Sequence, residues 1–560
     1  MGLVWLMHVV VSLWWLQRNP LPNGFQNEIL HLGNALDIWV VYQFDNLGLL
    51  HDFLFKGYWP PLVYVTSMVP VSILGPSRDS FVAVNFGWLA LLMGATFAIG
   101  RRLFSPGVGL AAAILISFFP SIYGNVVRFE PNIALTAVVT LSIWTLIRSS
   151  EFTRSRWALL FGVISGVGLL VDRLAYGFFI YAPSLLAWFR GLSSAWSSGS
   201  RRSQIIGNGI WSLVALLVVA GYYHSFFFAI HSEEIFSQAA AGEIIETGEQ
   251  TERRDPLKLL TWLFYPLTLM DSQVGPVLAL VLVPAVLVGV VLYLRSRPSQ
   301  IVLAWLLGSL AFFSLVQKKQ VFYTIPLLPA VALLAAAGLM RGLKGGWRVL
   351  VISAVAVAAL LQYQALMTGE SPLPSFYTYN RDGRLQSVDL RPILGRSPLP
   401  GAWVSPRYPQ ARPPDDHDLR MPEVLAAVEE FRGDLPVFRV GTYSDDHVLY
   451  EGYLTFFVRA ANPYIRINGL MGNLQAFYEW ARAMDLFIYV TSESRTWPPA
   501  QEIDQTLSSF HRQDLTYPVA DLMENLEPRF ELQRSIQLET GATIYFYTPL
   551  IATEETTSEP

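Results

Sequence analysis

The sequence predicts a polytopic α-helical membrane protein of about 11 membrane helices, followed by an α/β domain outside the membrane. Of its 560 residues, 52% are hydrophobic and only 15% are charged, which is unusual for a soluble protein. Apolar runs long enough to cross a bilayer recur along residues 1–366. Beyond them, helix-like and strand-like patterns alternate.

Composition also excludes several classes of protein. A net charge of -4 argues against a nucleic-acid partner, since phosphate binding needs a basic face. With 0 cysteines, the chain has no disulfide, no thiolate zinc site and no cysteine nucleophile. The sequence has no Walker loop, no dinucleotide-binding glycine fingerprint and no GxSxG elbow in a usable context. A soluble nucleotide is therefore not the obvious source of energy or of a transferred group.

Each expected membrane helix is a mostly apolar segment. The segments are 1–16, 80–100, 106–124, 131–148, 157–171, 174–190, 205–230, 274–294, 299–316, 320–340 and 347–366. The first has the length of a signal sequence but lacks a basic n-region and a small-residue cleavage site, so we expect a retained helix. Residues 64–74 are short and contain Pro70, so we expect them to dip into the membrane without crossing it.

Basic residues near helix ends predict the orientation, because they stay in cytoplasmic loops. They fall in every second loop, while acidic residues occupy the alternate loops. The exceptions are Arg18, Arg253, Arg254, Lys258, Lys318 and Lys319. The pattern predicts a cytoplasmic N-terminus and an extracytoplasmic C-terminal domain. The basic residues of the five loops expected inside are Arg101, Arg102, Arg148, Arg154, Arg156, Arg190, Arg201, Arg202, Arg295, Arg297, Arg341, Lys344 and Arg348.

The expected domains follow from these segments. Residues 1–366 form the transmembrane domain, with a first outer loop at 17–79 that holds interfacial helices and a second at 231–273. Residues 367–420 are a linker rich in Pro, Ser, Arg and Gly, 421–550 are the α/β domain and 551–560 are a disordered tail. In the α/β domain we expect helices at 422–431 and 474–484, and strands at 437–440, 453–459, 486–490 and 542–547.

Two carboxylates near the outer ends of helices are candidate catalytic groups. Partial desolvation at a lipid interface would make Glu28 a general base, but Asn27 before it is also an ordinary helix start. Glu130 precedes Pro131 at the first turn of a membrane helix, where an acid also complements the helix dipole. For both acids, a catalytic role and a structural role at the start of a helix remain open.

Basic residues at the same outer face are candidate phosphate ligands. Lys318 and Lys319 lie in a short outer loop, which favours an anionic ligand such as a lipid phosphate, or else contact with outer headgroups. Arg173 beside Asp172 is most simply an ion pair in a tight turn, with phosphate binding as the alternative.

The first outer loop holds further polar residues at partly helical spacing. Most of them fit the solvated face of interfacial helices. His31 and His51 could form a metal site together with Asp or Glu, but their spacing matches no tight metal-ligand template. The others in this group are Asp37, Asp45 and Asp52.

An ordered set of motifs resembles the GT-C superfamily of membrane glycosyltransferases. The set comprises an acid soon after the first helix, a PPL step, RRLF, an acid opening a helix that ends in LIRS, a charged turn in GLLVDR, and KKQVFYTIPLLPAVALLAAAGL. It covers about residues 1–366 and is most similar to the bacterial protein O-mannosyltransferase and aminoarabinose transferase group. The resemblance implies the GT-C fold in a bacterial inner membrane.

The resemblance also implies roles for residues. The family's Asp-Glu pair in the first outer loop is Asn27-Glu28 here, so Glu28 replaces the usual aspartate as base, or Asp37 or Glu130 does. Glu130 matches the family's second acid. The residues that the resemblance and the loop chemistry together assign to substrate binding are Asn27, Asp37, Lys56, Arg173, Lys318, Lys319 and Tyr323, with Lys56 replacing the family's lysine at Trp59.

The implied reaction moves a sugar from a polyprenyl-phosphate donor to an extracytoplasmic hydroxyl of a protein, lipid or glycan, with inversion. Basic residues hold the leaving phosphate, and a divalent metal is compatible with the reaction but not required. A second reading is a non-catalytic subunit of the same fold that presents the outer domain as a binding module. A third, a lipid or solute transporter, predicts mid-helix polar residues and internal repeats, and these are scarce.

Overall fold

The fold comes from a computed structural model of the chain. It describes residues 1–19, 26–44, 46–198, 202–240, 252–253, 259–316, 318–319, 321–368, 378–379, 385–386, 414, 418–444, 451–462, 464–469, 484–492, 530–539 and 541–550. Most of the expected linker, the helix expected at 474–484 and the tail expected at 551–560 lie outside these residues.

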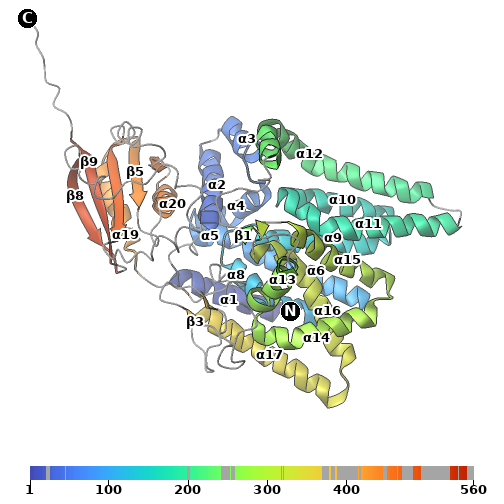
Figure 1. Cartoon of the computed structure of the whole chain (residues 1–560). Helices are drawn as coiled ribbons and strands as arrows, with labels where there is room; N and C mark the ends of the chain where they lie inside the picture. Colours follow the sequence, from blue (N-terminus) through green and yellow to red (C-terminus); the bar gives the residue numbers. More distant parts are fainter. Residues whose placement is uncertain are drawn as a thin grey trace, which may run out of the picture.

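The larger part of the molecule is a helical bundle (Figure 1). Each of the apolar segments expected to cross the membrane is mostly helical over its described residues, and the segment 106–124 is broken between α7 and α8. The helices are α1 (Gly2–Arg18), α2 (Gln26–Gln43), α3 (Leu47–Phe55), α4 (Leu62–Leu74), α5 (Arg78–Val82), α6 (Val84–Leu103), α7 (Pro106–Ser117), α8 (Pro120–Val126), α9 (Asn132–Ser149), α10 (Ser155–Leu169), α11 (Arg173–Ser198), α12 (Arg202–Ala240), α13 (Leu259–Thr268), η1 (Leu269–Gln273), α14 (Pro276–Tyr293), α15 (Arg297–Leu315), η2 (Val321–Leu327), α16 (Leu328–Gly342) and α17 (Gly345–Thr368).

Within the described residues, six helices are long and apolar enough to cross a membrane, or seven if the bent pair α7 and α8 is one span. The pair bends by 62°. The bend has a local cause: Pro120 opens α8, and Phe119 before it takes the extended conformation that a following proline imposes. Helix α4 has 13 residues, about 20 Å of helix, which is too short to cross about 30 Å of hydrocarbon.

Four of the arginine-rich loops expected in the cytoplasm contact one another in two pairs. Arg190 Nη1 donates to the carbonyl of Arg297 at 3.2 Å. Arg341 Nη2 donates to the carbonyl of Phe104 at 3.4 Å. Each of these contacts joins loops that lie more than a hundred residues apart in the sequence, as expected if the two loops of each pair lie on the same side of the membrane.

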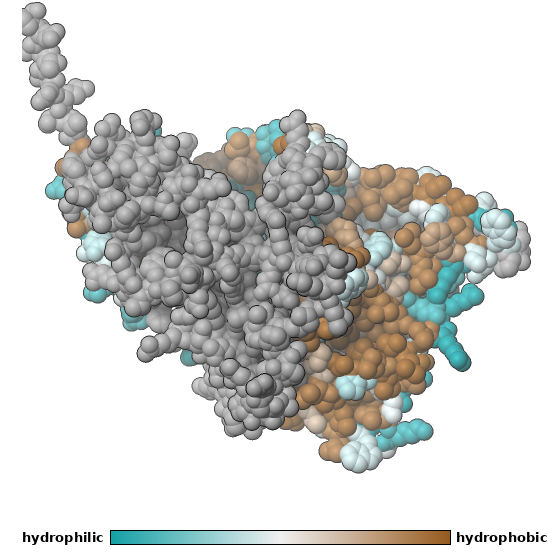
Figure 2. Space-filling view, in the orientation of Figure 1, coloured by the Kyte–Doolittle hydropathy of each residue, from teal (hydrophilic) through white to brown (hydrophobic). Residues whose placement is uncertain are grey.

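A broad apolar surface covers the side of the bundle (Figure 2). Large apolar side chains of α12 and α14 face outward there rather than into the core. Since water would not favour so large an apolar area, this side faces lipid. The exposed residues include Ile210, Trp211, Leu213, Leu217 and Val218 of α12 and Leu280, Leu287 and Val291 of α14.

The C-terminal part contains a five-stranded mixed sheet of order β6-β5-β7-β9-β8. Its strands are β5 (Phe438–Ser444), β6 (Ile465–Gly469), β7 (Leu486–Ser492), β8 (Phe530–Gln537) and β9 (Ala542–Pro549). Strand β5 is parallel to both β6 and β7, whereas β9 is antiparallel to both β7 and β8. The predicted strands at 437–440, 486–490 and 542–547 and the helix at 422–431, now α19 (Met421–Arg432), are confirmed.

The strand predicted at 453–459 is wrong, because these residues lie in helix α20 (Glu451–Ala461). The sequence YLTFFVR is rich in residues that favour strands, but α20 connects β5 to the parallel strand β6. A parallel crossover needs a connecting segment long enough to return along the sheet, usually a helix. In Figure 1, α20 lies between the sheet and α2 of the bundle.

Candidate functional site

The carboxylate of Glu28 lies inside the protein in an ion pair. Glu28 is 0% exposed, and its Oε1 accepts hydrogen bonds from Arg78 Nε at 3.2 Å and from the backbone N–H of Phe129 at 3.2 Å. A charge removed from water is tolerated only with such partners. Helix α2 is thereby tied both to α5 and to the segment between α8 and α9.

Arg78 is anchored on every side. Its Nη1 donates to the carbonyl of Asn19 at 3.0 Å and its Nη2 to the carbonyl of Val127 at 3.3 Å. The guanidinium also lies 5.7 Å from the ring centroid of Trp15. Arg78 therefore connects the end of α1, helix α2 and the segment after α8 in one buried network.

Glu130 lies next to this network but has a different environment. Its side chain is only partly buried, and its Oε2 accepts a hydrogen bond from Asn132 Nδ2 at 2.7 Å. The 127–131 loop that carries it is fixed by Asn85, whose Nδ2 donates to the carbonyl of Arg128 at 2.6 Å. Of the two predicted catalytic acids, Glu130 is the one that solvent reaches.

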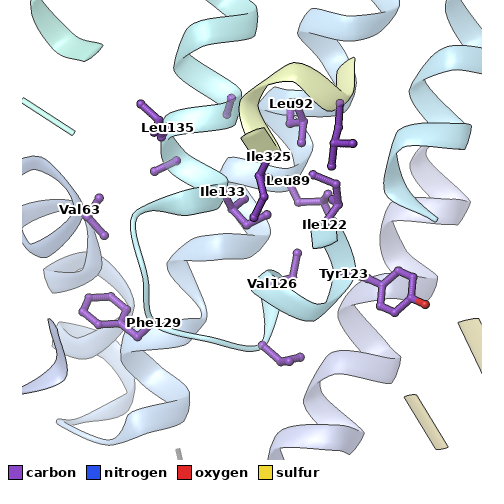
Figure 3. Close-up of a cluster of buried hydrophobic side chains, with 14 of the residues drawn as sticks. Val63, Leu89, Leu92, Ile122, Tyr123, Val126, Phe129, Ile133, Leu135 and Ile325 are labelled. Carbon is purple, nitrogen blue, oxygen red and sulfur yellow. The ribbon is translucent and has the colours of Figure 1, made fainter. Parts of the chain in front are cut away.

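An apolar cluster packs against this loop (Figure 3). Ile122, Val126, Ile133 and Ile325 are each at most 1% exposed, and Phe129 packs on the side of Val63. Each fully buried side chain of this size contributes about 1.5–3 kcal/mol. The loop position is thus set by core packing of α8, α9 and η2, and not only by polar contacts.

Arg173 lies in a cage of aromatic rings. Its guanidinium carbon is 3.9 Å from the ring centroid of Tyr58, 4.2 Å from Phe227 and 5.6 Å from Trp59. A planar guanidinium that stacks on rings keeps its N–H groups in the ring-parallel plane, where they can meet an anion. We call Arg173, Tyr58, Trp59 and Phe227 the arginine cage.

The first turn of α4 connects the cage to the acidic loop. The N–H of Leu62 donates to the carbonyl of Leu170 at 3.1 Å, just before the turn that bears Arg173. Two residues later in the same turn, the ring of Tyr64 lies 6.3 Å from that of Phe129, which is next to Glu130 in the sequence. The turn that bears Arg173 and the loop that bears Glu130 therefore both contact the first turn of α4.

Asp172, beside Arg173, has a raised proton affinity. Burial raises its pKa to about 6, although the neighbouring Arg173 and a backbone hydrogen bond from Ala175 oppose this shift. The ion pair expected for this turn therefore depends on pH, because the carboxyl group of Asp172 changes charge near neutral pH beside the guanidinium of Arg173.

His31 is a buried residue of the core. Its Nδ1 lies 2.7 Å from the hydroxyl of Tyr64, and burial lowers the pKa of His31 to about 4, so the ring is neutral at pH 7. His51 contacts Asp52 at 3.3 Å and Tyr222 at 2.9 Å. No three His, Cys, Asp or Glu side chains come together as metal ligands in the described ranges.

Other predicted substrate ligands have partners within the protein. Lys56 Nζ lies 2.7 Å from Asp52 Oδ1, and Asp37 pairs with Arg459 of α20. Tyr323 lies in η2 against Phe313, with ring centroids 5.8 Å apart.

The backbone of the predicted lysine pair, Lys318 and Lys319, lies in a short strand. Lys318 and Lys319 form strand β2, which pairs antiparallel with β1 (Glu252–Arg253) from the second predicted outer loop. Thus the two loops that were expected outside meet at this point. The side chain of Asn27 lies outside the described part of the chain, as do the side chains of the two lysines.

Sequence reasoning missed Arg78 and Asn85. Arg78 had a usable signal, since it lies in a loop expected on the outer side, where basic residues are disfavoured. Asn85 is a buried amide in the apolar helix α6, where an uncompensated polar group would be costly. Neither signal names the partner, because Glu28 and the 127–131 loop are brought to these residues only by the fold.

Comparison with known proteins gives the same architecture. The family described as dolichyl-phosphate-mannose-protein mannosyltransferase matches residues 59–222. No curated protein sequence matches the chain. ArnT from Cupriavidus metallidurans matches in its apo state with a TM-score of 0.56 and 14% identity over 97% of both chains.

The same ArnT bound to undecaprenyl phosphate matches with a TM-score of 0.54 and 14% identity, again over 97% of both chains. The apo oligosaccharyltransferase of Archaeoglobus fulgidus is more distant, with a TM-score of 0.44 and 10% identity over 87% of this chain and 69% of that chain. The chain is therefore a membrane protein with the GT-C fold. The resemblance to the GT-C superfamily of glycosyltransferases, inferred from the sequence motifs, is confirmed.

Proposed function

We propose that this protein is a membrane glycosyltransferase that moves a sugar from a polyprenyl-phosphate donor to an extracytoplasmic hydroxyl, with inversion. The observation that carries the proposal is the position of α4, whose first turn contacts both the turn bearing Arg173 and the loop bearing Glu130. A cation for a leaving phosphate and a carboxylate for an incoming hydroxyl are the two groups that this reaction requires.

Glu130 is the better candidate for the general base. Glu28 is fully buried and ion-paired with Arg78, so an acceptor hydroxyl would have to break that pair to reach it. Glu130 is partly exposed, and the adjacent amide of Asn132 orients its carboxylate. In this proposal Glu28 and Arg78 position the loop that carries the base. The substitution of Asn27 for the family's aspartate then does not remove the base.

Arg173 is the proposed ligand of the donor phosphate. The rings of the arginine cage hold its guanidinium carbon 3.9 Å from the ring centroid of Tyr58 and 4.2 Å from that of Phe227, and planar guanidinium groups suit phosphate oxygens. Lys318 and Lys319 are proposed to add positive charge through the loop that β1 and β2 hold in place. In the ArnT comparison the bound lipid is undecaprenyl phosphate, which supports a polyprenyl donor for this chain.

The proposed step balances as a single displacement. The acceptor oxygen forms a bond to the anomeric carbon while its proton passes to Glu130, and the bond from that carbon to the phosphate oxygen breaks. Polyprenyl phosphate leaves with the electron pair, and Arg173 stabilises the negative charge that develops on it. The acceptor is a protein, lipid or glycan on the outer side of a bacterial inner membrane.

The test supplies the purified protein, reconstituted in bilayers, with radiolabelled polyprenyl-phosphate sugars and an envelope extract as acceptor. We expect labelled acceptor and equimolar release of polyprenyl phosphate. If no donor is consumed although polyprenyl phosphate copurifies with the protein, the alternative of a non-catalytic subunit of the same fold is the correct one. Its sequence support is Asn27, where the family has aspartate.

A further inference from the structure

Helix α20 of the C-terminal part packs against α2, the helix that carries Glu28 (Figure 1). The contact includes an ion pair between Arg459 of α20 and Asp37 of α2, each of which is 25% exposed. Farther along, the ring of Tyr464 lies 5.5 Å from that of Phe44, just after the end of α2. The C-terminal part is therefore attached to α2 at more than one position.

A second set of contacts connects α20 to the buried Glu28–Arg78 ion pair through aromatic rings. The ring of Phe456 lies 6.1 Å from that of Phe81 in α5. Phe81 is one turn after Arg78 and lies 5.6 Å from the ring of Phe129. Arg78 and the N–H of Phe129 both donate to Glu28, so Phe81 is connected to this network through helix α5 and through its contact with Phe129.

We propose that α20 is a positioning element of the transferase, in which Arg459 and Phe456 hold α2 and α5 in the arrangement that places the 127–131 loop. The inference rests on the proposed function and deepens it. Arg459 fixes α2 through Asp37, and Phe456 fixes α5 through Phe81. A displacement of about 1 Å at a reacting group is enough to cost about a hundredfold in rate.

This proposal gives Asp37 a role different from substrate binding. Its carboxylate is directed at Arg459, so its charge serves the attachment of α20. A charge reversal distinguishes the two roles. If Asp37 acts through Arg459, exchanging the two charges preserves the attraction; if Asp37 binds substrate, Asp37→Arg is inactive whatever residue occupies position 459.

The first experiment measures sugar transfer by Arg459→Glu, by the exchange variant Asp37→Arg/Arg459→Glu, and by the milder Phe456→Leu. Arg534→Glu is the matched control, because Arg534 pairs with the exposed Glu430. We expect Arg459→Glu to lower kcat by about tenfold or more at an unchanged donor KM, and the exchange to restore it to within about threefold. An unrestored exchange variant, or full activity of Arg459→Glu and Phe456→Leu, overturns the proposal.

The second experiment does not depend on activity. The chain has 0 cysteines, so Ser80→Cys introduces a single thiol, at a position in α5 that is 2% exposed. We expect maleimide to label this thiol about tenfold faster when Arg459→Glu is added, and no faster with Arg534→Glu. If wild type transfers no sugar but labelling accelerates, the proposed function fails and the attachment stands. If transfer occurs and neither rate nor labelling responds to Arg459→Glu, the positioning role fails.

Discussion

Arg78 Nε donates to Glu28 Oε1 at 3.2 Å, and the two side chains are 4% and 0% exposed. The pair joins residues fifty positions apart and lies directly against the 127–131 loop. Its burial makes it a strong structural constraint, because neither charge can be left alone in the protein interior. The same burial removes Glu28 from contact with substrate.

Breaking this pair on one side is expected to destabilise the fold. Glu28→Gln leaves the Arg78 guanidinium without its counter-charge, at a cost of about 3–5 kcal/mol in the free energy of unfolding. Unfolding of the purified protein in mixed micelles by increasing SDS measures this. Adding Arg78→Gln should cost less than the sum of the single changes. A change below about 1 kcal/mol, as for an exposed pair, would contradict the buried geometry.

The arginine cage is expected to set donor affinity. Tyr58→Leu removes the ring nearest Arg173, and a cation–π contact contributes about 0.5–2 kcal/mol, or about 2- to 30-fold in affinity. The matched control is Tyr58→Phe, which keeps the ring and removes the hydroxyl. Equilibrium binding of a labelled polyprenyl phosphate to the two variants checks this. Equal loss in both variants would assign the effect to the hydroxyl instead.

Asp172 predicts a pH dependence of donor binding. Burial raises the pKa of Asp172 to about 6 from its ordinary value of 3.8, so the folded state favours the neutral carboxyl. Above pH 6 the ionised form offsets the charge of Arg173. The stability of the folded state falls as pH rises from about 3.8 to about 6, because the folded state binds more protons than the unfolded state in this window. A phosphodiester donor should therefore bind roughly three- to tenfold more tightly at pH 5 than at pH 7.

Asp172→Asn is the control for this effect. With no titrating group beside Arg173, the variant should bind the donor at pH 7 as tightly as the wild type does at pH 5, and its affinity should stay constant across the window. A wild-type affinity that is constant between pH 5 and pH 7 would show that the two groups are not coupled.

Much of the fold was predictable because long apolar runs indicate the positions of helices in the sequence, independently of how the helices pack. The prediction at 106–124 missed the break at Pro120, since an apolar run reports length and not direction. The strand prediction at 453–459 failed because residue preferences favoured a strand, whereas the parallel crossover between β5 and β6 required a helix. Local composition cannot express that requirement, because it depends on which strands pair.

The site was predictable only in part. Glu28, Glu130 and Arg173 could be selected from the sequence because they are charged residues at helix ends in an apolar chain, where burying a charge is costly and indicates a function. The sequence could not separate the two acids, because their difference lies in Arg78, whose pairing with Glu28 depends on the packing of α5 against α2. The aromatic residues of the arginine cage come from two stretches that meet only in the fold.

The most direct test compares sugar transfer by wild type, Glu130→Gln and Glu130→Asp in bilayers, with polyprenyl phosphate affinity measured on each. Loss of a general base predicts a rate lower by about 10²–10⁴-fold for Glu130→Gln, with donor affinity within about twofold and partial activity in Glu130→Asp. Transfer at the wild-type rate by a folded Glu130→Gln protein would contradict the account and return the role of base to another carboxylate.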